Sequence, residues 1–375
     1  MKKSITVIGT RGIPDVLGGV ETHCQHLFPE IKRLNDLEQT QCDICVIARS
    51  PYVDYKEGVY KKVRTKSIWA PKKKSLEAII HSTLASFSTL FDGSDIVHVH
   101  AIGPGLVAPL LRLLGKKVVF THHGPDYDRQ KWGKLAKQIL MLGEKFAVKY
   151  STEVIVISEV INDIIKEKYN RQDAHLIYNG VERPKPLDTS KIDGSLKEFG
   201  LEKQNYFVAV GRLVEEKGFH DLIEAYQKSN IKMPLVIMGD TDHPTPYSDK
   251  LKKQAAGVDG VIMTGFLKGE QLQAIFSQAK TFVMPSYHEG LPIALLEALS
   301  YSLPAIVSDI PANLEVSLPQ DCYFTTANVT ELSESLLKAD KAVFTAQDYE
   351  KHLDLYDWTK IAKQVNDLYT SMLKK

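Results

Sequence analysis

Short apolar segments alternate with longer amphipathic segments along most of this 375-residue chain. The apolar segments have the length of buried strands, and the segments between them repeat apolar residues at helical spacing. Strands that alternate with helices favour a parallel sheet with helices on both faces. The sequence therefore predicts an α/β fold.

The predicted elements fall into two sets, on either side of a proline-containing linker at 181–190. In the first set we expect strands at 5–8, 45–48, 96–99, 118–121 and 154–157, and helices at 18–34, 75–91, 104–115, 131–150 and 159–169. In the second we expect strands at 207–210, 235–238, 261–264, 281–284 and 305–307, and helices at 218–228, 247–256 and 269–279. We expect domains at 1–182 and 190–355, then an amphipathic helix in 356–375. Two such domains would leave a cleft that faces the carboxyl ends of their strands.

The composition narrows the class of protein. A net charge of +1 gives no sign of a nucleic-acid partner. The four cysteines do not form a disulfide framework. Cys42 and Cys45 have redox spacing but lie in a strand pattern, where they would face opposite sides. The residues after Met1 make too short an apolar run for a signal peptide, and no run reaches the roughly 20 residues of a membrane span. We expect a cytoplasmic protein, with a possible place at the inner face of the membrane.

Two carboxylates mark the segment between the strands at 281–284 and 305–307. Glu289 lies in a predicted loop and Glu297 in the helix after Pro292, a residue that suits a first helical turn. At ~1.5 Å per residue, eight residues of helix would separate them by roughly 12 Å, about the length of a nucleotide sugar. Each carboxylate can accept two neighbouring hydroxyls. The alternative is a surface loop glutamate and an unrelated glutamate on a helix face.

A second loop, Gly211-Arg-Leu-Val-Glu-Glu-Lys-Gly218, follows the first strand of the second domain. It places Arg212 and Lys217 at the carboxyl edge of that sheet. A guanidinium and an ammonium can bind a diphosphate and stabilise it as a leaving group. Two solvated cations are the alternative.

The first domain offers a glycine-rich loop and a group of histidines. Gly18 and Gly19 permit a tight turn with free N–H groups for an anion, although the spacing matches neither the dinucleotide nor the P-loop pattern. Glu21 follows, where a simple N-terminal helix charge is also reasonable. His122 and His123 end a strand, and only one is expected to enter the cleft. His98, His100 and His122 suggest a metal site only weakly, so we expect no metal and no cofactor.

The motif from Glu289 to Ala298, Glu-Gly-Leu-Pro-x-x-x-Leu-Glu-Ala, resembles the E-x7-E signature of retaining glycosyltransferases with two Rossmann-like domains, the GT-B fold. The Gly211–Gly218 loop resembles the G-R-L-x-x-x-K-G motif of the same family. The bacterial mannosyl-, rhamnosyl- and hexosaminyl-transferases of surface polysaccharide synthesis are most similar. The family usually has glycine where this chain has Ser302.

The resemblance implies a donor, an acceptor and roles for particular residues. The donor would be a UDP-, GDP- or dTDP-sugar, and the acceptor a hydroxyl of a glycan or lipid-linked oligosaccharide. Catalytic candidates are His123, in better register than His122, with Arg212, Lys217 and Glu289. The donor-binding candidates are Gly18, Gly19, Arg212, Lys217, Glu289, Gly290, Leu291 and Glu297.

Three further interpretations remain open. An epimerase or a phosphorylase could use the same fold, although no pyridoxal-binding lysine motif is found. A sensing module with an inactive site is the non-enzyme alternative. The segment 60–74 carries seven basic residues and no acidic one, and 129–149 adds six more beside Trp132. These segments suggest peripheral contact with an anionic membrane, or else solvated basic faces.

Overall fold

The computed structural model describes residues 3–16, 18–71, 77–128, 133–241 and 244–374. The chain forms two compact units. Unit 1 comprises Met1–Gly180 and Leu355–Lys375, and unit 2 comprises Val181–Asp354. The chain therefore leaves unit 1 once and returns to it for its last 21 residues.

Unit 1 contains an eight-stranded sheet in the order β3-β4-β2-β1-β5-β6-β7-β8, parallel except for the pairing of β3 with β4. Its strands are β1 Lys3–Ile8, β2 Cys42–Arg49, β3 Glu57–Tyr60, β4 Val63–Ile68, β5 Ile96–His100, β6 Lys117–His122, β7 Glu153–Val156 and β8 His175–Leu176. Its helices are α1 Gly19–Leu37, α2 Glu77–Ser88, α3 Ala108–Leu113, α4 Lys134–Tyr150, α5 Glu159–Tyr169 and α14 Trp358–Lys374, with the short 3-10 turns η1 Ser50–Tyr52, η2 Pro104–Val107, η3 Asp126–Asp128 and, at the return from unit 2, η6 Asp354–Tyr356.

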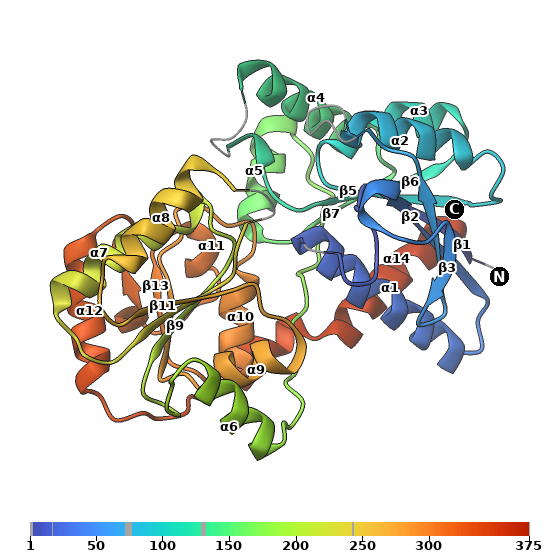
Figure 1. The fold of residues 1–375 in the computed structure, drawn as a ribbon. Coiled ribbons are helices and arrows are strands. Elements are labelled where there is room, and N and C mark those ends of the chain that lie inside the picture. The colour runs from blue at the N-terminus through green and yellow to red at the C-terminus, as the bar shows by residue number, and fades with distance from the viewer. Residues whose placement is uncertain (1–2, 17, 72–76, 129–132, 242–243, 375) are drawn as a thin grey trace. The chain divides into compact units, whose positions relative to one another are not determined.

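Helices cover both faces of this sheet. Helices α1 and α14 pack on one face through a single apolar core, and α2, α3 and α4 lie across the sheet from them (Figure 1). The helix expected at 104–115 is divided into η2 and α3. The basic segment that begins at residue 60 forms much of the β3–β4 hairpin at the sheet edge, while residues 72–74 lie outside the described ranges.

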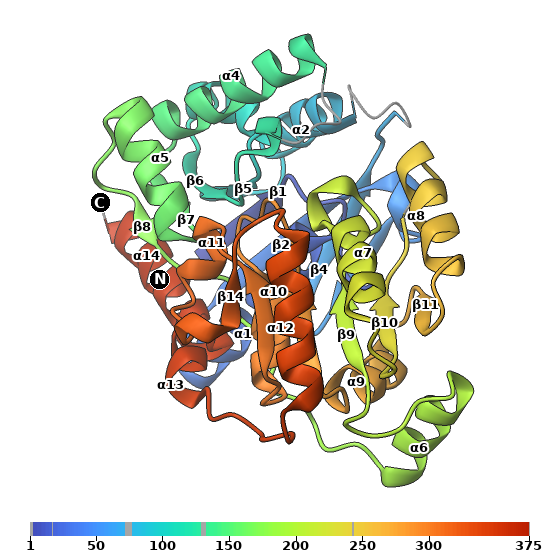
Figure 2. The ribbon, with the colours of Figure 1, turned by 90° about the vertical axis from the view of Figure 1, so that its left-hand side faces the viewer.

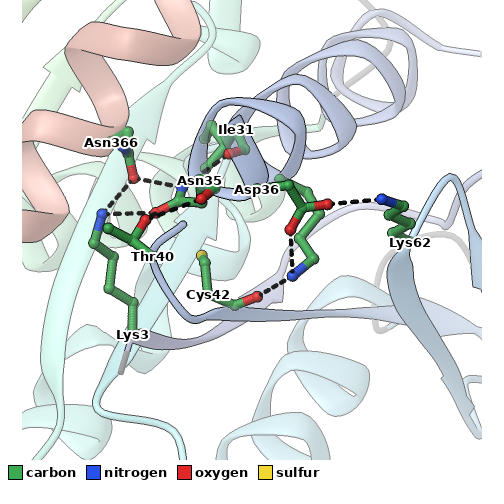
Figure 3. A network of polar contacts seen from close by, with 9 residues as sticks. Lys3, Ile31, Asn35, Asp36, Thr40, Cys42, Lys62 and Asn366 are labelled. Atoms are coloured by element: carbon green, nitrogen blue, oxygen red, sulfur yellow. Dashed lines mark hydrogen bonds and ion pairs between the residues drawn. The ribbon is translucent and has the colours of Figure 1, made fainter. Parts of the chain in front are cut away.

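Buried polar contacts also join helix α14 to the rest of unit 1, at β1 and α1 (Figure 3). The Asn366 side-chain oxygen accepts hydrogen bonds from Lys3 Nζ at 2.8 Å and from Asn35 Nδ2 at 2.9 Å. Asn35 Oδ1 accepts from Lys3 Nζ at 2.9 Å and from the Thr40 hydroxyl at 2.7 Å. Burial lowers the pKa of the Lys3 ammonium. Because every partner here is an oxygen acceptor or an amide, the network satisfies this buried ammonium without a carboxylate.

Unit 2 has a six-stranded parallel sheet in the order β11-β10-β9-β12-β13-β14. Its strands are β9 Phe207–Val210, β10 Leu235–Met238, β11 Val261–Gly265, β12 Thr281–Met284, β13 Ala305–Ser308 and β14 Tyr323–Phe324. Its helices are α6 Thr189–Glu198, α7 Phe219–Ser229, α8 Pro246–Ala256, α9 Gly269–Ser277, α10 Ile293–Ser300, α11 Pro311–Leu314, α12 Val329–Lys341 and α13 Glu350–Leu353, with 3-10 turns η4 Glu215–Lys217 and η5 Gln320–Cys322.

Helices α7, α8 and α12 pack on one face of this sheet around a shared core, with α9 and α10 on the other (Figure 2). Helix α8 begins with a capping box in which Thr245 and Ser248 satisfy each other's backbone N–H groups. Helix α10 is followed by Ser302 at φ +59°, so the serine adopts the left-handed conformation that a glycine supplies at low cost. The turn therefore keeps its geometry despite the change of residue.

Candidate active site

In unit 2 the strand order reverses between β9 and β12, which are neighbours in the sheet but far apart in the chain. Ligands of open α/β sheets bind outside the carboxyl ends of the strands at such a switch point. The loop after β9 is 211–218 and the loop after β12 is 285–292. These are the two loops that the sequence marked with Arg212, Lys217 and Glu289.

The two loops are joined by a short ion pair. Lys217 Nζ lies 2.6 Å from Glu289 Oε1, and the side chains are 20% and 11% exposed. The Ser286 hydroxyl donates to the same carboxylate oxygen at 2.7 Å. The Tyr287 N–H donates to the Glu216 carbonyl at 2.8 Å. Side-chain and backbone hydrogen bonds therefore hold Lys217 and Glu289 together at the carboxyl ends of β9 and β12.

A glycine makes this approach possible. Gly218 has φ +65°, and a Cβ added to it would lie 2.1 Å from the Pro285 carbonyl oxygen. Any other residue would push the two loops apart. The glycine that ends the 211–218 motif therefore sets the distance between Lys217 and Glu289.

The other predicted residues of unit 2 lie on the same two loops and the helix that follows. Arg212 is exposed in the 211–218 loop, Gly290 is half-buried, and Leu291 is buried. Glu297 lies on α10 with a half-buried side chain. Burial raises the pKa of the Tyr301 hydroxyl, and the charge of Glu297 raises it further.

A polar network that the sequence did not predict supports the 285–292 loop. The Tyr287 hydroxyl donates to Asp221 Oδ2 at 2.6 Å and lies 3.0 Å from His220 Nε2. Since the hydroxyl proton is used by Asp221, His220 Nε2 carries a proton and donates to the Tyr287 oxygen. His220 Nδ1 lies 2.9 Å from the Tyr247 hydroxyl. The first turn of α7 thereby positions the loop that carries Glu289.

Unit 2 also has a cavity of about 390 Å³ between β11 and α8, next to the residues that follow β10. Gly239, Asp240, Lys252 and Met263 are among its lining residues. A Cβ at Gly239 would lie 2.0 Å from the Gly211 carbonyl oxygen, so the cavity adjoins the 211–218 loop.

In unit 1 the strand order reverses between β1 and β5, and the glycine-rich loop follows β1. Glu21, on the first turn of α1, folds back over this loop and is only 7% exposed. Its Oε1 accepts from the Arg11 N–H at 2.8 Å. Gly18 has φ +143°, and a Cβ there would lie 2.1 Å from Glu21 Oε2. Gly18 therefore permits the carboxylate to fix the loop, and Gly19 begins the helix.

His122 and His123 have different surroundings. His122 is fully buried; its Nε2 lies 2.8 Å from Glu144 Oε1, and its Nδ1 accepts from the Gly124 N–H at 3.0 Å. Nδ1 is therefore unprotonated, and Nε2 donates to the carboxylate. Burial raises the pKa of Glu144, but hydrogen bonds from His122 and Tyr169 outweigh it and leave that pKa lowered. His122 thus fixes the turn at Gly124, while His123 is half-buried.

His123 belongs to a histidine cluster. Its Nε2 lies 2.9 Å from His100 Nδ1, and His23 of α1 packs against it with ring centroids 5.0 Å apart. His98 is instead bound to the Tyr369 hydroxyl and to Thr121 Oγ1, each at 2.6 Å. The structure therefore does not bring together His98, His100 and His122, the three histidines that the sequence weakly suggested as a metal site. The histidines that meet are His23, His100 and His123.

Comparisons with known proteins define the class. Residues 17–183 match the family model Glycosyltransferase Family 4, and residues 193–347 match Glycosyl transferases group 1. With two parallel-sheet α/β domains, the chain is a glycosyltransferase of the GT-B fold.

Particular proteins are similar to this chain in sequence or in fold. Alpha-maltose-1-phosphate synthase of Mycolicibacterium smegmatis is 24% identical over 95% of this chain and 96% of that enzyme. An Escherichia coli UDP-Gal:alpha-D-GlcNAc-diphosphoundecaprenol alpha-1,3-galactosyltransferase is 32% identical over 58% of this chain and 59% of its own length. HepE of Anabaena, solved in complex with UDP and glucose, has a TM-score of 0.79 at 14% identity, covering 99% of this chain and 100% of that chain. This last likeness concerns the fold.

Proposed function

We propose that this protein is a retaining hexosyltransferase. It would transfer a sugar from a nucleotide diphosphate sugar to a hydroxyl of a growing glycan or lipid-linked oligosaccharide in bacterial surface polysaccharide synthesis. The observation that carries this proposal is the Lys217–Glu289 pair at the switch point of unit 2, with Arg212 in the same loop. It combines the two chemistries that such a donor requires, a cation for phosphate and an acceptor for sugar hydroxyls.

The cations act on the diphosphate. The Arg212 guanidinium can fork two phosphate oxygens, and the Lys217 ammonium adds a compact charge. Backbone N–H groups at Gly18, Gly19, Gly290 and Leu291 supply further donors for the donor molecule. These groups stabilise the negative charge that develops as the sugar–phosphate bond breaks.

The two carboxylates hold the ends of the donor. Glu289 accepts hydroxyls of the transferred sugar, and Glu297 accepts the ribose hydroxyls. In the retaining reaction the bond from the anomeric carbon to the phosphate oxygen breaks. A bond to the acceptor oxygen forms on the same face, and the acceptor proton moves to the departing phosphate. Retention is proposed from the resemblance of the Glu289–Glu297 motif to the E-x7-E signature.

Unit 1 contributes His123. Its neutral imidazole can hydrogen-bond a hydroxyl of the transferred sugar, and its place after β6 is fixed by His122 and Gly124. UDP is the first nucleotide to test, because HepE was solved with UDP and the Escherichia coli relative is named for a UDP-linked donor. That relative is also named for a diphosphoundecaprenol-linked acceptor, which supports a lipid-linked acceptor here.

A lipid-linked acceptor makes membrane contact part of the proposal. Within the described ranges, no helix combines the length and the apolarity needed to cross a bilayer. In the β3–β4 hairpin, Lys62, Arg64 and Lys66 are paired with Asp36, Asp43 and Glu57, which weakens this hairpin as a basic surface. Arg129, Lys131 and Trp132 of the second basic segment lie outside the described residues.

Helices α2 and α4 provide a better lipid-facing surface. Both pack against η2, on the same side of unit 1 (Figure 1). Their exposed side chains include the apolar residues Leu84, Phe87, Leu90 and Phe91 near α2 and Leu135, Met141 and Leu142 on α4. Lys134, Lys145 and Lys149 are exposed on α4 among them. Apolar side chains beside lysines suit an anionic bilayer surface.

The test begins with a thermal-shift screen of UDP-, GDP- and dTDP-sugars. A ligand of the folded state adds RT ln(1 + [L]/Kd) of stability, so the true donor should raise the melting temperature. That donor is then incubated with lipid-linked acceptors, and the anomeric configuration of the product is read by NMR. An inverted product would exclude the retaining reaction. Conversion of the donor to an epimer without any acceptor would instead identify an epimerase.

A further inference from the structure

The histidine cluster of unit 1 gathers three imidazoles from three separate elements. His23 comes from α1, His100 from the end of β5, and His123 from the loop after β6. One nitrogen from each ring lies within 4.8 Å of the other two. The ring centroids of His23 are 5.5 Å from His100 and 5.0 Å from His123. We call these three residues the histidine trio.

The trio leaves buried nitrogens unsatisfied. Among the described residues, Nε2 of His100 is buried without a hydrogen-bond partner, and the buried ring nitrogens of His23 have only the side chain of Asn179 as a weak neighbour, which raises the pKa of His23 slightly. His23 is 4% exposed and His100 is fully buried. A buried polar atom without a partner costs about 1–3 kcal/mol, and native proteins rarely leave several together. One ion can bind only one nitrogen of each ring, so a bound metal ion would supply a partner for one nitrogen of His23.

The electrostatics of the trio favour neutral rings. Burial lowers the pKa of His23, His100 and His123 below the ordinary value, and the neighbouring histidines lower that of His100 and His123 further. Each neutral ring has one nitrogen with a lone pair, although between His100 and His123 one of these lone pairs accepts a hydrogen bond that an ion would have to replace. That is the form in which histidine binds a metal ion. A protonated trio would place like charges about 3 Å apart.

We propose that His23, His100 and His123 bind a divalent transition-metal ion of the class that prefers imidazole nitrogen, zinc first among them. Zinc binds histidine at about 2.0–2.1 Å with tetrahedral geometry, which separates neighbouring ligand nitrogens by roughly 3.3 Å. The 2.9 Å between His100 Nδ1 and His123 Nε2 and the 4.8 Å limit of the trio bracket that separation. Ring rotations that move the nitrogens by about 1 Å would complete the site. Three ligands leave one position open for water or an anion.

The surroundings hold the ligands in place. The His100 ring stacks on His98 at 4.2 Å, and His98 is itself fixed by Tyr369 and Thr121. His23 packs edge-on against Trp358 at 5.6 Å. Ligand rings that are oriented by packing before the ion arrives lose little freedom when they bind it. The half-buried His123 provides the side from which an ion can enter.

A spectroscopic titration of the full chain tests the site without reference to sugar transfer. After removal of metals with EDTA, Co²⁺ is added as the probe, and the visible absorption of tetrahedral cobalt is recorded. Zinc is then titrated to displace the cobalt. Wild type and the control His26→Gln should give the absorption, because His26 lies on α1 three residues from His23 but outside the trio. His23→Gln and His100→Gln should bind cobalt at least about 10–100-fold more weakly. Mutations of residues that only support a metal ligand already weaken metal binding by that factor, so loss of a ligand should weaken it at least as much.

Two outcomes would overturn the metal site. The first is wild-type cobalt affinity no greater than that of His23→Gln, and the second is an equal loss in His26→Gln. If His100→Gln fails to fold, His23→Gln decides, together with the histidine NMR signals of wild type. Zinc should shift the signals of the trio and not that of His26.

Zinc inhibition of sugar transfer is a further test, and it alone rests on the proposed role of His123. An ion on His123 would withdraw that ring from the transferred sugar, so transfer should fall as the trio fills. Cobalt absorption without inhibition would support the metal site and contradict the sugar-binding role of His123. Inhibition that persists in His23→Gln would count against the trio as its cause.

Discussion

The two units have the same kind of switch point but fill it with different chemistry. In unit 2, a lysine and a glutamate form a partly exposed ion pair between the loops after β9 and β12. In unit 1, the corresponding strand ends carry buried imidazoles whose pKa values are lowered by burial. Charge is thus placed where the proposed ligand is a diphosphate, and neutral groups are placed where it is a sugar. In each unit the topology fixes the location of the switch point, and the side chains decide what it can bind.

The largest effect should follow removal of the unit 2 cations. We expect Lys217→Ala and Arg212→Ala each to lower kcat/KM by about 10²–10³-fold, because one preorganised charge partner typically contributes ~2.7–4 kcal/mol to transition-state stabilisation. Steady-state kinetics with the identified donor provide the measurement. Lys228→Ala is the control, because this exposed lysine on α7 bonds the Thr330 hydroxyl and lies outside the 211–218 loop. Near-wild-type turnover in both variants would show that Lys217 and Arg212 do not stabilise the diphosphate in the reaction.

A second test separates the two carboxylates. Glu297→Gln should weaken binding of the nucleoside diphosphate itself, whereas Glu289→Gln should weaken only the sugar nucleotide. Loss of a hydrogen bond to a charged group costs about 1.5–3 kcal/mol, or roughly 10–100-fold in affinity. Glu289→Gln also releases Lys217 from its ion pair, so the nucleoside diphosphate should bind at least as tightly as to wild type. Calorimetry with both ligands decides, and equal losses for both ligands in both variants would contradict the two-ended assignment.

The neutral histidines of unit 1 can be tested at His81, outside the trio. Burial, with the nearby Arg49 charge, lowers the pKa of His81 to about 4, although the Ala48 carbonyl and Glu77 oppose the shift. The unfolded chain therefore binds an extra proton between pH 6.5 and 4, so wild type loses stability as pH falls through that window. From pH 7 to 5 this loss should be about 2 kcal/mol, at about 1.4 kcal/mol per pKa unit.

Glutamine can keep the bond to the Ala48 carbonyl but cannot be protonated. Urea unfolding at both pH values should therefore show a smaller acid loss for His81→Gln than for wild type. An identical loss in the two proteins would mean that His81 is not held neutral in the folded state.

The smallest expected effect is on binding to anionic membranes, which compares exposed residues of unit 1 with those of unit 2. Basic residues near an anionic bilayer contribute about 1 kcal/mol each. Replacing Lys134, Lys145 and Lys149 by serine, or Phe87 and Phe91 by serine, should reduce salt-sensitive cosedimentation with anionic vesicles. Replacing the exposed Lys250 and Lys253 on α8 of unit 2 by serine should not, and Lys145 and Lys149 replaced as a pair give the variant that removes the same number of charges. Equal absence of binding to anionic and neutral vesicles at low salt would exclude the membrane surface and favour a soluble acceptor. The triple change of Lys72, Lys73 and Lys74 to serine tests the first basic segment in the same assay.

The sequence predicts those parts of the structure that depend on local pattern. Buried strands such as 207–210 and 281–284 are confirmed residue for residue, because continuous apolar runs between turn signals leave few alternatives. Helix α12 and the β3–β4 hairpin were not predicted. The strands of that hairpin mix charged and apolar residues at an exposed sheet edge, where burial imposes no clear period.

The candidate site was predictable only where residues sit in contiguous motifs. Lys217 and Glu289 are each marked by a local pattern, although nothing local states that they form an ion pair 72 residues apart. His23 and Glu144 had no local signal. Their roles arise only when α1 and α4 pack against strands that are distant in the chain.

The polar network around Asn366 has a consequence for biosynthesis. Ile361, Val365 and Tyr369 of α14 belong to the same apolar core as Ile5 and Phe28, yet they are translated after the whole of unit 2. On the ribosome, the first 180 residues must wait with one sheet face covered by α1 but not by α14, and with the Lys3 ammonium bonded to Asn35 but not to Asn366. Unit 2 can complete its own core in the meantime. Domains usually fold in order from the N-terminus during synthesis. Here unit 1 begins to emerge first but completes its core last.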